Sequence, residues 1–267
     1  MVAAARDRTD GVASDISTAA FVLRTRPHGE SDRLVTVITE EHGKLTGIAK
    51  GAKNSRRRFA GTLEPFMQIR AVFQMRPHSD LVFLQRCELV SPLHAFTTDL
   101  ARYAAGSYIL ELADRMVLGR ESSVDVYRLV REALEDIDRA GASDAVLGAF
   151  ELRLLAASGY EPSLGTCRSC GRPADGTPTV YLVPERGGFL CRPCVRPGEI
   201  VRPVSGSTTR RLTVLATASF EDARRGESPT PEMRAVTEAL LLAVTNGPLR
   251  SRAFLGLGRV DSPIALR

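Results

Sequence analysis

The chain has 267 residues, of which 43% are hydrophobic and 25% are charged, a balance typical of a globular protein. Its formal net charge of +5 favours an acidic partner. No apolar run reaches the roughly 18–20 residues that cross a bilayer, and the first residues lack the apolar core of a signal peptide. We therefore expect a cytoplasmic protein, with residues 1–16 as a disordered tail.

Residues 17–92 carry short apolar runs of strand length, separated by turn residues at 27–29, 42–43 and 77–80. Five strands in so short a span favour a closed or nearly closed barrel, because an open sheet of this size would expose its edges. The sequence predicts an OB-type barrel here, and an SH3-like barrel is the alternative.

The segment 44–59 lies between two apolar runs of this region and is strongly basic. It holds all three lysines of the chain, adds three consecutive arginines at 56–58, and contains no Asp or Glu. Six unopposed charges beside a barrel form an electrostatic groove for a polyanion. If all six neutralised phosphates, single-strand affinity would fall with salt at a log–log slope of roughly −4. A solvated loop kept soluble by charge is the alternative, but it leaves the absence of acidic residues unexplained.

Aromatic residues are scarce, at 6% of the chain with no tryptophan. We expect Phe59 near the groove, and Phe66 and Phe73 in the barrel core. Stacking platforms for bases require aromatic side chains. Binding is therefore expected to depend on backbone charge and to be indifferent to sequence.

After residue 92 the hydrophobic period changes from two to 3.6. Apolar stripes predict helices around 109–117 and 126–137, and a third from Ser143 as N-cap to Gly159 as C-terminal glycine. Pro231 opens a further helix near the C-terminus. These faces predict a helical bundle formed by residues 93–160 and 204–267.

The intervening segment, 161–203, is too poor in apolar residues to order itself. It contains two Cys-x2-Cys pairs, Cys167 with Cys170 and Cys191 with Cys194, and a predicted hairpin between them. Four thiolates at this spacing close a tetrahedral shell around one structural Zn²⁺, as in a zinc ribbon. Disulfides or a redox pair are the alternative, which a reducing cytosol disfavours.

No catalytic constellation is recognisable in the sequence. It contains no HExxH arrangement, no Gly-x-Ser-x-Gly elbow and no complete P-loop. A metal site formed by four cysteines also leaves no open position for water or substrate. The chain is therefore not expected to be an enzyme.

Two stretches resemble a known family. HGESDRLVTVITEEHGKLTGIAKGAKNSRRRFAGTLEPF, residues 28–66, is similar to the N-terminal signature of the RecO recombination-mediator proteins. In that family a Gly-Glu-Ser-Asp turn precedes a strand, and a Gly-Lys strand leads into an Ala-Lys-Gly basic segment and a Leu-x-Pro-Phe. FELRLLAASGYEPSLGTCRSCG resembles the family's junction between a helix and the zinc module. The resemblance covers residues 21 to about 255.

The resemblance implies an α+β architecture: an N-terminal five-stranded OB-type barrel over 17–92, then a helical bundle carrying a four-cysteine zinc-ribbon insertion. It implies binding of single- and double-stranded DNA, annealing of complementary strands and association with the nucleoid. With a RecR-type partner, it implies loading of RecA onto DNA coated by single-stranded-DNA-binding protein, whose acidic C-terminal tail family members contact.

We expect the DNA contacts to be basic side chains of the barrel and its basic segment. The main candidates are Arg33, Lys44, Lys50, Lys53, Arg56, Arg57 and Arg58, with Arg24 and Arg26 as weaker ones. The alternative function is that of a zinc-ribbon adaptor, in which the zinc module and helices bind proteins and the basic segment only assists.

Overall fold

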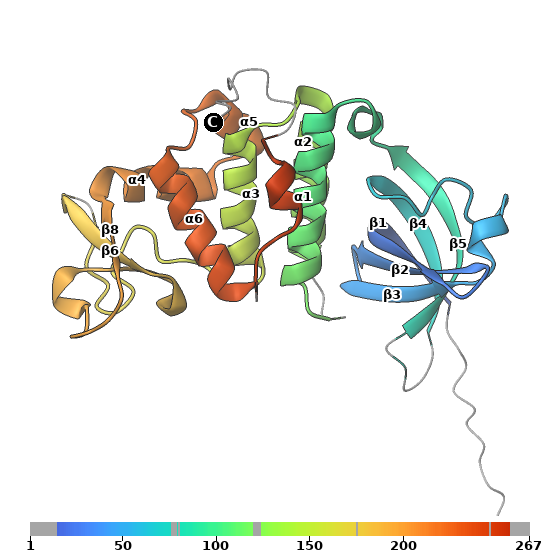
Figure 1. The fold of residues 1–267 in the computed structure, drawn as a ribbon, viewed down its shortest axis with the longest axis horizontal. Coiled ribbons are helices and arrows are strands. Elements are labelled where there is room, and N and C mark those ends of the chain that lie inside the picture. Colours follow the sequence, from blue (N-terminus) through green and yellow to red (C-terminus); the bar gives the residue numbers. More distant parts are fainter. Residues whose placement is uncertain are drawn as a thin grey trace, which may run out of the picture.

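The computed structural model describes residues 15–75, 79, 81–119, 124–174, 176–245 and 247–256. The molecule is elongated, with a β-barrel at one end, helices in the middle and a small sheet at the other end (Figure 1). The predicted tail, 1–16, lies outside the described residues except for 15 and 16, which belong to the first strand. Of the predicted turn at 77–80, only residue 79 is described.

The N-terminal unit is a closed barrel whose strands follow the order β1-β2-β3-β5-β4. Only the β3–β5 pair is parallel, and the other four neighbouring pairs are antiparallel. This confirms the predicted five-stranded OB-type barrel. Its strands are β1 (Asp15–His28), β2 (Asp32–Thr39), β3 (Lys44–Ala49), β4 (Met67–Gln74) and β5 (Leu81–Pro92).

The barrel interior is filled by alternate residues of each strand, such as Val35 and Val37 of β2. Phe73 belongs to this core, as predicted. Phe59 is not in a groove but is also buried in the core, at 4% exposure. Phe66 lies outside the barrel core, stacked on Phe96 with ring centroids 4.7 Å apart. It therefore belongs to the contact between the barrel and the helices.

The helical part is a bundle organised around one central helix, α3. α3 packs against α1 and α2 on one side and against the C-terminal helices on the other, so apolar residues surround it almost completely. No described helix is long and apolar enough to cross a membrane. The helices are α1 (Leu100–Met116), α2 (Val124–Ala140), α3 (Asp144–Ala157), α4 (Gly206–Thr217), α5 (Phe220–Arg225) and α6 (Pro231–Val244).

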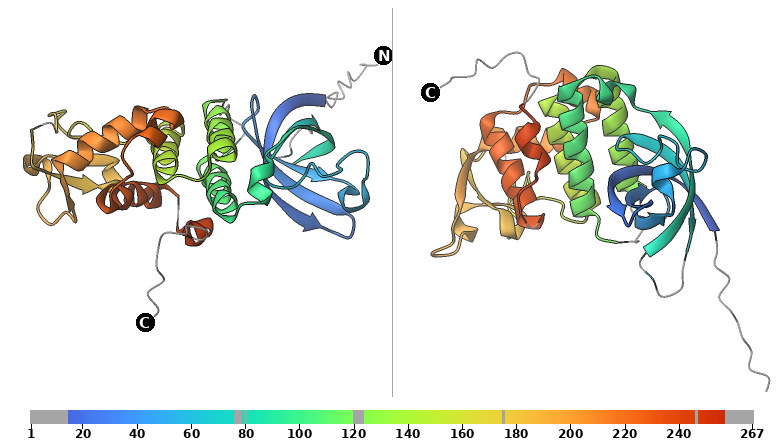
Figure 2. Two further views of the ribbon diagram at one scale, coloured as in Figure 1. Left: turned by 90° about the horizontal axis from the view of Figure 1, so that it is seen from above. Right: turned by 45° about the vertical axis from the view of Figure 1, so that its right-hand side comes forward.

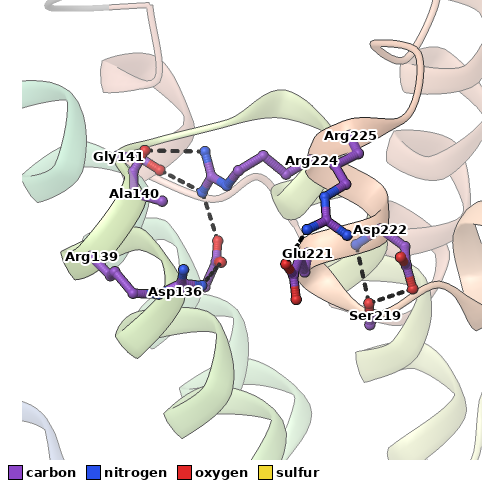
Figure 3. A network of polar contacts seen from close by, with 9 residues as sticks. All are labelled: Asp136, Arg139, Ala140, Gly141, Ser219, Glu221, Asp222, Arg224 and Arg225. Carbon is purple, nitrogen blue, oxygen red and sulfur yellow. Dashed lines mark hydrogen bonds and ion pairs between the residues drawn. The ribbon is translucent and has the colours of Figure 1, made fainter.

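A buried ion pair ties the end of α2 to α5 (Figure 3). The carboxylate of Asp136 accepts hydrogen bonds from Arg224 at 2.6 Å and from Arg139 at 2.9 Å. Arg224 also donates to the carbonyl oxygens of Ala140 and Gly141. This single guanidinium therefore joins the C-terminus of α2, the turn that follows it and a helix more than eighty residues later.

The barrel and the helices share one continuous apolar cluster, in which Phe21 and Ile38 of the outer barrel wall meet α1 and α2. Gly106 of α1 allows this close approach, because a Cβ there would lie 2.4 Å from the ring of Phe96. Both views of Figure 2 show the barrel directly against these helices. The barrel is thus attached through its wall, and its far side remains open.

The last unit is an antiparallel sheet of order β7-β6-β8. The predicted hairpin is present: β6 and β7 pair across a turn that contains Gly187 at φ +70°. The strands are β6 (Thr179–Val183), β7 (Gly188–Leu190) and β8 (Arg202–Ser205). The short 3₁₀ turns of the chain are η1 (Ala52–Asn54), η2 (His94–Thr97), η3 (Pro184–Arg186), η4 (Arg192–Cys194) and η5 (Ser251–Phe254).

Candidate nucleic-acid interface and metal centre

The basic segment is held on the barrel by apolar residues within it and shortly after it. Ala52, Phe59 and Leu63 all enter the barrel core. Between these anchors the side chains at 56–58 are exposed to solvent. The sequence folds this way because burial of the apolar residues is favourable, whereas burial of unpaired guanidinium groups is not.

The start of the segment is locked to the turn between β1 and β2. Asp32 accepts a hydrogen bond from the backbone N–H of Gly51 at 2.8 Å, and this bond is the main cause that lowers the pKa of the Asp32 carboxyl. Lys53 Nζ donates to the carbonyl oxygens of Gly29 and Glu30, at 3.0 and 2.7 Å. The Gly-Glu-Ser-Asp turn and the basic segment therefore form one structural unit.

The arginines at 56–58 are exposed, and two of them are unpaired. Arg56 and Arg57 form no ion pair or hydrogen bond with any residue that the structure describes. Arg58 is fixed: its guanidinium donates to the carbonyl oxygen of Lys50 at 2.7 Å, and its own carbonyl accepts from the N–H of Cys87 at 2.9 Å. Because the acceptor of the guanidinium is a neutral carbonyl, the positive charge of Arg58 is uncompensated by it.

Two predicted contacts lie elsewhere. Lys44 Nζ is 3.3 Å and Arg24 Nε is 2.9 Å from the carboxylate of Asp114 on α1. Lys44 also donates to the carbonyl oxygen of Asp114, and its side chain is only 18% exposed. Both cations therefore hold the barrel against α1. Their expected contacts with DNA stay a prediction beside this structural role.

Two further candidates are on the open side of the barrel. Arg33 of β2 forms a surface ion pair with Glu64 at 2.8 Å. Arg26 is exposed near the end of β1 and has no ion-pair partner within the described ranges. Because surface ion pairs are worth only about 0–1 kcal/mol, Arg33 remains accessible to a competing anion.

An open groove of about 580 Å³ adjoins the basic segment and was missed by sequence reasoning. It lies along the parallel contact between β3 and β5, where Lys50 and Arg58 meet side chains of β5. Lys50 Nζ stands 4.9 Å from the centre of the Phe83 ring. The two-residue alternation of β5 could have placed Phe83 on the outer face, but no local pattern indicates that β3 would pair beside it.

The four cysteine sulfurs come together beside the β6–β7 hairpin. They all lie within 4.8 Å of one another, and those of Cys170 and Cys191 are 3.7 Å apart. A tetrahedral ion with metal–sulfur bonds of about 2.3 Å requires sulfurs about 3.8 Å apart. The predicted ligands Cys167, Cys170, Cys191 and Cys194 therefore fit a single metal ion.

Backbone contacts bring the two cysteine pairs together. Ser163 accepts from the N–H of Phe189 at 3.1 Å and donates its own N–H to Gly187, so the first knuckle lies along β7. Gly188 is required at this contact, because a Cβ there would lie 2.5 Å from the carbonyl oxygen of Ser163. The metal site is thus prearranged by the hairpin.

The thiols of the cluster are electrostatically unequal. Burial would raise the pKa of Cys167, but N–H donors led by Cys191 outweigh it and lower that pKa to about 6. Burial and the neighbouring thiols raise the pKa of Cys191 to about 12. The site therefore favours one thiolate by itself, and several adjacent thiolates require a cation between them.

Two family models match the chain. The model described as Recombination protein O N terminal matches residues 14–93, and the one described as Recombination protein O C terminal matches residues 97–253. The chain is 36% identical over 243 residues to the DNA repair protein RecO of Geobacter sulfurreducens, which covers 90% of this chain and 97% of that protein. The DNA repair protein RecO of Myxococcus xanthus is 37% identical over 224 residues, 83% and 87% of the two chains.

A third relative, the DNA repair protein RecO of Anaeromyxobacter sp. strain K, is 35% identical over 225 residues. The match covers 84% of this chain and 88% of that protein. These names describe DNA repair, and none of the three describes an enzymatic activity. The comparisons agree in covering both the barrel and the helical part.

Proposed function

The chain belongs to the RecO family of DNA repair proteins, and on this premise we propose that it is a non-enzymatic mediator that binds DNA and anneals complementary strands. The observation that carries the proposal is the pair of exposed arginines, Arg56 and Arg57, which have no partner in the part of the chain that the structure describes and lie on a segment anchored at both ends in the barrel. Cations held in this way need no rearrangement to meet a phosphate backbone.

The proposed contacts form one surface on the open side of the barrel. Lys53 and Arg58 are oriented by backbone carbonyls, so their charges are fixed without being neutralised. Arg33 joins this surface by exchanging its exposed partner Glu64 for a phosphate. The proposed set is Arg26, Arg33, Lys50, Lys53, Arg56, Arg57 and Arg58.

Annealing follows from this charge distribution without any bond being made or broken. Two phosphate backbones repel each other, and a cationic surface between them lowers that repulsion. The side chains bind phosphates rather than base edges, so the bases remain available to pair. A protein acting in this way needs no nucleotide hydrolysis.

We propose further that the four cysteines hold one structural Zn²⁺. Four protein sulfurs complete a tetrahedral shell and leave no position for water or substrate. The ion would supply the positive charge that lets Cys191 and its neighbours coexist as thiolates. Its binding free energy would stabilise the fold of the segment 161–203, which has only a small apolar cluster of its own.

Family membership also supports the proposed partners. We propose that the chain acts with a RecR-type partner to load RecA onto DNA coated by single-stranded-DNA-binding protein, and that it contacts the acidic C-terminal tail of that coating protein. In the cell it would work in the cytoplasm, associated with the nucleoid.

The decisive experiment is a salt series of single-strand binding with the wild-type chain and the triple variant Arg56→Ala/Arg57→Ala/Arg58→Ala. Five cations of the basic segment remain once Lys44 is assigned to the contact with α1. For the wild-type chain, the contribution of this segment to the slope of log affinity against log salt concentration should therefore be roughly −3.5. Removal of three should reduce its magnitude by about 2, and annealing of two complementary oligonucleotides should slow in parallel.

The matched control is Arg128→Ala/Arg139→Ala/Arg225→Ala, which removes three exposed arginines from the helical part at the same net charge. It should change neither the slope nor the annealing rate. An unchanged slope in the basic-segment variant would move the DNA surface elsewhere. Normal DNA binding without any acceleration of annealing would favour the adaptor function instead.

A further inference from the structure

A row of side chains crosses the open face of the barrel at right angles to the strands. Strand pairing sets Leu34 of β2 opposite Ile48 of β3, and Ile48 opposite Phe83 of β5. Each of these three side chains is partly exposed, although each is apolar. At a strand spacing of about 4.8 Å, the strip from β2 to β5 spans roughly 10 Å. It is a continuous apolar strip on the outer face of the barrel.

Positive charge borders the strip at both ends. Arg26 of β1 pairs with Leu34 and is exposed at one end. At the other end, Lys50, Arg58 and Arg86 line the groove in which Phe83 lies. The only acid paired with these cations in the described structure is Glu88, which is 3.7 Å from Arg86 and 69% exposed. An apolar strip with cations along its margins complements a polyanion that also carries flat apolar groups.

Phe83 at present carries the ammonium group of Lys50 above its ring, at 4.9 Å. A cation–π contact at an exposed site is worth about 0.5–1 kcal/mol. Stacking of a nucleic-acid base on an aromatic side chain is worth about 1–3 kcal/mol, and the displaced ammonium gains a phosphate partner. Measured against the Lys50 contact alone, the exchange favours the base, and Lys50 moves from the ring to the phosphate backbone of the bound DNA strand.

We infer that single-stranded DNA crosses the barrel along the row from Arg26 to Phe83 and stacks one base on Phe83. The inference rests on the proposed function and adds to it a preference for single strands at this position. In a duplex the bases are paired and stacked on one another, so a duplex offers the groove only its phosphates. The inference departs from the expectation that binding depends on backbone charge alone, and the experiment below distinguishes the two.

The chain contains no tryptophan, so Phe83→Trp creates a single fluorescent reporter at the stacking position. Titration with an unstructured 20-nucleotide strand should quench its emission. Duplex DNA, or an abasic strand with the same number of phosphates, should not quench the emission at equal concentration. Fluorescence anisotropy of a labelled strand should show that both nevertheless bind. The matched control is Leu89→Trp, also on β5 and 47% exposed but outside the groove lining, which should not be quenched.

A second variant keeps the inference testable if the larger indole ring is poorly accommodated at position 83. Phe83→Ala should weaken single-strand binding by roughly five- to one-hundredfold and leave duplex binding unchanged. Bound DNA without quenching, equal quenching at positions 83 and 89, or equal losses for single strand and duplex would each overturn the stacking inference. In those cases the proposed function would stand. Failure of the wild-type chain to bind any DNA would overturn both.

Discussion

Replacement of Asp136 by alanine should lower the free energy of unfolding by about 2–3 kcal/mol, because the carboxylate is buried and accepts from two arginines (Figure 3). Its side chain is 6% exposed, and the bond from Arg224 is 2.6 Å long. A hydrogen bond to a charged group contributes about 1.5–3 kcal/mol. Arg139, whose side chain is 70% exposed, adds no more than about 0.5 kcal/mol.

The loss should stay below the roughly 3–5 kcal/mol typical of a stranded buried charge. Without Asp136, Arg224 still donates to the carbonyl oxygens of Ala140 and Gly141, and a quarter of its side chain reaches water. The charge of Arg224 therefore keeps partial compensation. The main loss is the charged hydrogen bond between Arg224 and Asp136.

Thermal unfolding followed by circular dichroism would measure the effect. For a chain of this size, about 2–3 kcal/mol corresponds to a fall in Tm of roughly 4–12 °C. Arg139→Ala is the control, since it removes the exposed half of the network and should lower Tm by less than about 2 °C. If Asp136→Ala lowered Tm no more than Arg139→Ala, the reasoning from burial and hydrogen bonding would be refuted.

Two further predictions concern the metal centre and a buried acid. Cys191→Ser should abolish stoichiometric zinc in freshly purified, unoxidised protein and lower Tm, and equal zinc content in variant and wild type would contradict the proposed site. Burial is the main cause that raises the pKa of Glu151 from 4.5 to about 7. The folded chain thus keeps a proton that the unfolded chain releases, so unfolding free energy should fall as pH rises from about 4.5 to about 7. Glu151→Gln should flatten that part of the pH profile of urea unfolding, and identical profiles would contradict the assignment.

Local sequence patterns were sufficient to predict which segments form strands and which form helices. The short apolar run that contains Val35 and Val37 indicated a strand, and α3 begins directly after Ser143 as expected. The hydroxyl of Ser143 nevertheless makes no capping hydrogen bond. The preference of serine for the N-cap position therefore predicted where α3 begins, although this side chain does not cap the helix. The four cysteines were also identified correctly as a cluster, because the spacing of two knuckles around a hairpin is itself a local constraint.

The availability of each cation was not a local property. In the sequence Lys44 and Lys50 look alike, since both adjoin the same strand in a segment without acidic residues. Lys44 is neutralised by Asp114, which lies seventy residues later on a helix packed against the barrel wall. Lys50 lies on the open side of the barrel and has no ion-pair partner among the described residues. The docking of α1 therefore decided which of the two lysines is paired within the protein.

The same holds for the aromatic residues. Phe59 stands next to three arginines in the sequence, yet burial in the barrel core removes it from the surface, because transfer of its ring from water outweighs any local tendency to face the groove. Phe83 lies far from those arginines along the chain, and the parallel pairing of β3 with β5 places it in one groove with Arg58. The sequence by itself determined the barrel, the helices, the cysteine cluster and the concentration of charge. Which charges and rings share one surface was decided by long-range pairing and packing, since such contacts leave no periodic signal in the residues that make them.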